Sequence, residues 1–139
     1  MIQSYWLPTI RTAIAIDRGD AQKAIELLST ATEYELGQRP QWPAHGTLYP
    51  EYVRGEAYLR AGDGQQAAIE FQKIVDHRGI VANSLLGALA HLQLGRAYKL
   101  GRDAGKAREA YASFLVEWLH ADPDIPILKQ AKAEYAKLE

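Results

Sequence analysis

The sequence contains no cysteine, so neither disulfide bonds nor thiol chemistry contributes to its structure or activity. It also lacks an excess of either charge: 16 basic and 17 acidic side chains give a net charge of −1, too little to attract nucleic acid or anionic lipid. No apolar run approaches the roughly 18 residues of a membrane-spanning helix, and the N-terminus lacks the basic-then-apolar pattern of a secretion signal. We therefore expect a soluble chain that neither binds nucleic acid nor inserts into membranes, with a cytoplasmic location favoured.

Patterns that carry catalysis are also missing. The run from Gly101 to Lys106 resembles a phosphate-binding loop, but it is one residue short, is followed by Ala107, and follows a predicted helix instead of a strand. No serine has a His–acid arrangement visible in the sequence. The four histidines are scattered without the spacing of metal ligands: His45, His77, His91 and His120. We therefore expect no enzyme, no cofactor and no metal site, and we interpret His91 as a packed or capping histidine.

What the sequence does contain is helical periodicity, clearest at residues 85–120. Leu94, Gly95 and Tyr98 share one face at spacings of three and four residues, and a turn rich in glycine follows. A second apolar stripe then holds Ala107, Tyr111 and Phe114. Two helices joined by a short turn pack as an antiparallel hairpin, and the small residues Gly95 and Ala107 allow a close approach.

The same unit recurs at residues 49–77 and, more weakly, at residues 4–34. Asp122 and Asp124, beside prolines, are interpreted as capping an acidic helix start, and a final amphipathic helix covers about residues 124–138. One strongly polar face suits a helix that caps a stack. We therefore predict an all-α fold in a single domain over residues 1–139, with seven main helices: three hairpins and a capping helix.

The connector at residues 36–48 contains two prolines and two glycines, so it is predicted to be a long loop. Trp42 lies in it between Gln41 and Pro43. Trp42 either folds back over the seam of a hairpin or faces a ligand, since long loops often carry function. The sequence leaves both interpretations open.

Two copies of one pattern indicate an internal repeat. Gly55-x-x-Tyr58 matches Gly95-x-x-Tyr98, and three positions of the following helix also match: Ala67, Phe71 and Ile74 with Ala107, Tyr111 and Phe114. This pattern resembles the tetratricopeptide repeat, whose first helix carries Leu-Gly-x-x-Tyr and whose second carries Ala, Phe and Ala. That repeat is ~34 residues long, whereas Gly55 and Gly95 are 40 positions apart, so each connector carries an insertion. The resemblance implies that the hairpins stack as a short right-handed solenoid.

A narrower resemblance involves three runs: residues 78–81, residues 90–98 and residues 122–129. They are similar to C-terminal repeat regions of bacterial eukaryotic-like serine/threonine kinases. The chain would then be the sensory or scaffold part of a larger signalling protein, without kinase elements of its own. An extracytoplasmic location would follow if that larger protein is tethered to a membrane.

The repeat resemblance also implies a concave groove lined by the first helix of each hairpin. On it we place Trp6, Thr9, Ala13, Tyr49, Tyr52, Glu56, Leu89, Gln93, Arg96 and Lys99. Aromatic side chains at one end would bury apolar groups, while Arg96 and Lys99 at the other would meet acidic groups. Alternatively, Tyr52 and Leu89 are buried by neighbouring repeats and Arg96 is merely solvated.

The family's clamp for a C-terminal carboxylate is absent, because the matching positions hold Thr9, Ala13, Val53, Leu89 and Gln93. We expect a non-catalytic scaffold that binds a protein or peptide. The alternatives are a module that assembles into homo-oligomers and a regulatory domain of a kinase or transcription factor.

Overall fold

The computed structural model describes residues 5–29, 48–81 and 85–138. Within these ranges every regular element is a helix: α1 (Leu7–Asp17), α2 (Ala21–Leu27), α3 (Tyr49–Ala61), α4 (Gly64–Asp76), α5 (Arg78–Val81), α6 (Leu85–Leu100), α7 (Ala104–Glu117) and α8 (Pro126–Ala136). The all-helical prediction is confirmed, with seven main helices and the single turn α5 in the described chain. None of the described helices has the length and apolar character needed to cross a membrane.

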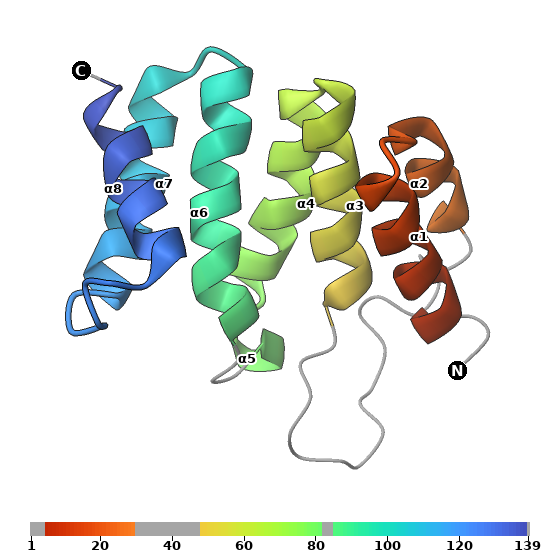
Figure 1. The fold of residues 1–139 in the computed structure, drawn as a ribbon, viewed down its shortest axis with the longest axis horizontal. Coiled ribbons are helices and arrows are strands. Elements are labelled where there is room, and N and C mark those ends of the chain that lie inside the picture. The colour runs from red at the N-terminus through yellow and green to blue at the C-terminus, as the bar shows by residue number, and fades with distance from the viewer. Residues whose placement is uncertain (1–4, 30–47, 82–84, 139) are drawn as a thin grey trace.

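The helices lie beside one another in the order of the chain (Figure 1). Helix α1 packs on α2, α3 on α4, and α6 on α7, each pair joined by a short turn. Helix α3 also contacts α1 and α2, and α6 contacts α3 and α4, while α8 packs on α7 at the end of the row. Helices α1, α3 and α6 therefore form one continuous layer.

The three turns between paired helices use the same chemistry. The side chains of Asp20, Asp63 and Asp103 each accept a hydrogen bond from the backbone N–H three residues later, at 3.1, 3.0 and 3.0 Å. These bonds satisfy one of the unpaired amides at the start of α2, α4 and α7. The residue before each aspartate is left-handed: φ is 79° at Gly19, 81° at Gly62 and 62° at Arg102. Arg102 thus occupies a position at which glycine is less strained.

Glycine determines how closely the paired helices approach. A Cβ atom on Gly55 would lie 2.6 Å from Cζ of Phe71, and one on Gly95 would lie 2.7 Å from Cδ2 of Tyr111. Phe71 and Tyr111 have no exposed surface. Each aromatic ring therefore fills the space that a side chain at the glycine would need, as the sequence predicted for small residues at these seams.

The start of the last helix differs from the sequence prediction. Asp122 and Asp124 do not cap it: α8 begins at Pro126, and its N-cap residue Ile125 makes no side-chain capping bond. Asp122 instead accepts a hydrogen bond from the backbone N–H of Asp124 at 2.8 Å, and Asp124 pairs with Lys129 at 2.7 Å. Proline at the first helical position needs no amide partner, which makes a side-chain cap less necessary there.

Candidate functional site

A pocket of about 440 Å³ opens between α1, α3, α6 and α8. Its lining residues come from all four helices: Ala13, Ile16, Asp17, Glu56, Leu59, Arg60, Gln93, Arg96, Gln130 and Glu134. Four of the residues that the sequence placed on the groove therefore meet here, namely Ala13, Glu56, Gln93 and Arg96. The first helices of three successive hairpins contribute to one site.

Arg96 is held by Glu134 of α8. Its Nε and one terminal nitrogen donate to the two carboxylate oxygens of Glu134 at 2.8 and 2.9 Å, and the Tyr111 hydroxyl donates to the same carboxylate at 2.7 Å. Burial raises the pKa of Glu134, but hydrogen bonds from Arg96 and Tyr111 and the charges of Arg96 and Lys99 outweigh it, so the pKa falls below its usual value. The sequence predicted a guanidinium open to an external carboxylate, whereas in the structure Glu134 already occupies that position.

Gln93 connects this ion pair to α3. Its amide nitrogen donates to the hydroxyl oxygen of Tyr52 at 3.1 Å and to Oε1 of Glu56 at 3.2 Å. Its amide oxygen accepts a hydrogen bond from Arg96 at 3.2 Å. The Gln93 side chain is buried, so these bonds satisfy groups that would otherwise be costly to remove from water.

Glu56 and Tyr52 are half-buried and sit one turn apart on α3. Burial raises the pKa of Glu56, although the charges of Arg60 and Arg96 and the bond from Gln93 act in the opposite direction. Burial, followed by the negative charge of Glu56, raises the pKa of Tyr52 to about 12. The Glu56 charge is therefore only partly compensated by its surroundings.

The aromatic residues that the sequence placed at one end of the groove make ring contacts in the structure. The ring centroids of Trp6 and Tyr49 lie 5.8 Å apart, and those of Tyr52 and Phe71 lie 5.6 Å apart in an edge-to-face arrangement. Thr9 does not belong to an accessible surface: it is buried, and its hydroxyl donates to the carbonyl oxygen of Tyr5 at 2.6 Å. That bond to the preceding turn satisfies the hydroxyl inside the fold.

The other predicted residues are not brought into the pocket. Leu89 is half-buried against a core from its own hairpin and α8, formed by Leu92, Phe114 and Leu128, and not against a neighbouring hairpin of the row. Lys99 is exposed, and its positive charge contributes to lowering the pKa of Glu134. Trp42 lies outside the described residues, as does most of the connector around it.

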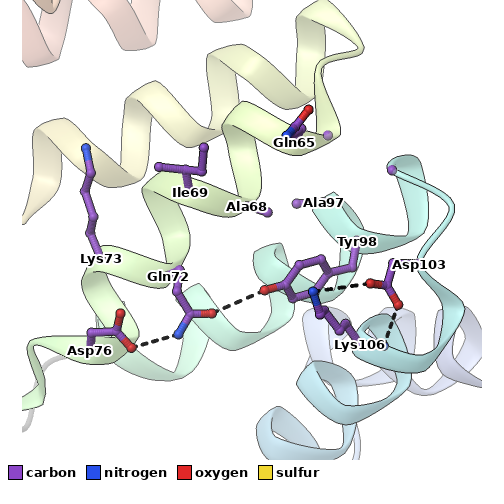
Figure 2. Close-up of a pocket in the computed structure, with 12 residues that line it drawn as sticks. Gln65, Ala68, Ile69, Gln72, Lys73, Asp76, Ala97, Tyr98, Asp103 and Lys106 are labelled. Carbon is purple, nitrogen blue, oxygen red and sulfur yellow. Dashed lines mark hydrogen bonds and ion pairs between the residues drawn. The ribbon is translucent and has the colours of Figure 1, made fainter.

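A second pocket, of about 580 Å³, lies between α4, the end of α6 and the start of α7 (Figure 2). The Tyr98 hydroxyl donates to Gln72 at 3.3 Å, and Gln72 donates to Asp76 at 2.8 Å. Lys106 lies 5.5 Å from the centre of the Tyr98 ring and pairs with Asp103 at 3.5 Å. The polar side chains drawn in Figure 2 thus largely satisfy one another across the pocket wall.

Sequence reasoning missed the contribution of α8. Glu134 and Gln130 are spaced as one face of that helix, yet this face was interpreted only as solvated. Asp17 and Arg60 were also missed, although both follow a groove residue on its own helix by one turn. Among the described residues, no group of three His, Asp or Glu side chains is placed to hold a metal ion.

Comparison of the chain with protein-family models, curated proteins and solved structures finds no match.

Proposed function

We propose that the chain is a non-catalytic scaffold that binds an extended peptide, or an extended segment of another protein, along α1, α3 and α6. In this proposal the three hairpins are tetratricopeptide-like units stacked in a right-handed solenoid, and α8 caps the stack. The sequence similarity to kinase repeat regions extends the proposal to the sensory or interaction part of a larger bacterial signalling protein.

One observation supports the groove most directly. Ala13, Glu56 and Gln93 lie on the first helices of three different hairpins, and the pocket brings them together. The packing of α4 against both α3 and α6, and of α2 against both α1 and α3, also agrees with stacked repeat units. A groove that crosses several repeats suits an extended ligand, because successive side chains can each meet a different helix.

Selection from a random peptide library tests the proposal. Peptides that bind the groove should lose about tenfold in affinity when Tyr52 is changed to alanine, because the half-buried ring supplies contact area. Glu109→Ala changes an exposed residue of α7 and should leave affinity unaltered. Selected peptides that tolerate Tyr52→Ala but are lost with Trp42→Ala would move the site to the connector.

Exposed apolar side chains favour self-association as a second candidate. Val116 in the last turn of α7 and Leu119 just after that helix are 71% and 72% exposed, and Leu85 at the start of α6 is 69% exposed. Exposed apolar groups of this size mark interaction surfaces when they gather on one face. Light scattering across a concentration series tests this candidate, and a monomer throughout would exclude it.

A further inference from the structure

The charges around the pocket between α1, α3, α6 and α8 do not cancel. Three carboxylates line it, on Asp17, Glu56 and Glu134, against two guanidinium groups, on Arg60 and Arg96. Arg96 and Glu134 neutralise each other through two short hydrogen bonds. What is left is Asp17 and Glu56 against Arg60, an excess of one negative charge.

In the described chain, the two carboxylates in this sum are not neutralised by direct contact with a cation. Arg60 is exposed at the last turn of α3, and in the described chain neither Asp17 nor Glu56 has an ion-pair partner within 4.0 Å. Glu56 is held toward the pocket by the amide of Gln93, which is itself fixed by Tyr52 and Arg96. A half-buried carboxylate in a fixed position is therefore available to a positively charged group.

Glu56 also lies in line with the aromatic residues of the proposed groove. Tyr49, Tyr52 and Glu56 follow one another along a single face of α3, and Trp6 extends the aromatic end. A ligand lying along this face would meet aromatic rings first and the carboxylates of the pocket next. A complementary peptide would therefore carry an apolar or aromatic side chain followed by a positively charged one.

Resting on the proposed function, we infer that the pocket between α1, α3, α6 and α8 binds the cationic side chain, lysine or arginine, of an extended peptide. Glu56 is the principal acceptor, because it is half-buried and water screens it less than an exposed group. Asp17 contributes from the exposed rim. The partner is thus basic at this point, the reverse of the acidic partner that Arg96 and Lys99 suggested in the sequence.

Peptide pools of defined composition provide the test. In each pool one central position is arginine, lysine, glutamine or glutamate, and all flanking positions are a mixture of uncharged residues, including tyrosine and leucine. Fluorescence anisotropy of the labelled pools gives the relative affinities. We expect the arginine and lysine pools to bind about tenfold more tightly than the glutamine pool, and the glutamate pool to bind most weakly.

Variants of the protein test whether the tighter binding of the arginine pool depends on the carboxylates of the pocket. Glu56→Gln keeps an oxygen that can accept the Gln93 amide, so it should preserve the fold while removing most of the arginine advantage. Asp17→Asn should remove a smaller part, because Asp17 is exposed. Glu109→Gln, the same chemical change on an exposed position of α7, should leave the advantage intact. Circular dichroism and denaturant midpoints verify that each variant is folded.

The outcomes separate the inference from the proposed function. Tighter binding of the glutamate pool, or an arginine advantage that survives Glu56→Gln, would overturn the inference. If the arginine and glutamine pools bind equally tightly and both lose affinity with Tyr52→Ala, the groove would stand while its charge preference would fall. Failure of every pool to bind would overturn both.

Discussion

Two glycine-to-alanine substitutions in the third hairpin should change stability in opposite directions. Gly95 lies on α6 at the seam with α7, whereas Gly105 lies in the first turn of α7 and is exposed. A Cβ atom on Gly95 would meet Cδ2 and Cε2 of Tyr111 at 2.7 and 2.8 Å, but one on Gly105 would meet nothing closer than an oxygen of Asp103 at 3.7 Å. The same chemical change therefore adds a clash in one place and none in the other.

The expected changes in the free energy of unfolding follow from two opposing effects, the helix propensity of alanine and the overpacking of the core. Alanine is favoured over glycine within a helix by about 1 kcal/mol, and by less near a helix end. Overpacking a filled core costs about 1–3 kcal/mol. Tyr111 is fully buried and its hydroxyl is bonded to Glu134, so the ring cannot withdraw without losing that bond. We expect Gly105→Ala to stabilise by about 0.5 kcal/mol, and Gly95→Ala to destabilise by about 1 kcal/mol.

Urea unfolding followed by circular dichroism measures both changes in one series. Gly95→Leu extends the series, and its larger side chain should cost about 1–3 kcal/mol. Equal slopes with shifted midpoints would show that the native fold is retained and only its free energy of unfolding changed. If Gly95→Ala raised the midpoint as Gly105→Ala does, the close approach of α6 to the Tyr111 ring would be refuted.

Arg102→Gly should stabilise the protein by about 1 kcal/mol, because the arginine has a left-handed backbone at the turn before α7; no rise in the thermal midpoint would contradict this. Arg54→Ala should destabilise by about 2–3 kcal/mol, because the buried carboxylate of Glu70 loses its 2.8 Å partner and keeps only the more exposed Lys73 at 3.0 Å. Lys73→Ala removes the more exposed partner of Glu70 and should cost less than about 1 kcal/mol in the same denaturant assay, so equal losses would argue against the difference in burial. Burial lowers the pKa of His91, so the unfolded state takes up protons first and the free energy of unfolding should decline as pH falls below about 6.5; a pH profile unchanged by His91→Gln would exclude this cause.

The helices and their seams could be predicted because they depend on residues close together in the chain. Gly95 and Tyr111 are joined by one short turn, and helical spacing alone places them on facing stripes. Asp63 and Asp103 lie within three residues of the end of one helix and cap the next, so the turn chemistry is also local.

The charge of the pocket could not be predicted in this way. Arg96 and Glu134 are 38 residues apart, and no spacing within either helix marks them as a pair. Pairing across helices decides which charges remain for a ligand, and it depends on tertiary packing.

The side-chain amide of Gln93 can be oriented in only one way, and this limits how α6 can move along α3. Its nitrogen is bonded to Tyr52 and Glu56 of α3, while its oxygen is bonded to Arg96 on its own helix. Turning the amide over would place its oxygen against the Glu56 carboxylate and its N–H groups against the guanidinium. A slide of α6 along α3 by one helical turn, about 5.4 Å, would break both bonds to α3 at once. The amide therefore fixes the axial position of α6 against α3, and with it the height at which Gln93 and Glu56 face each other in the pocket.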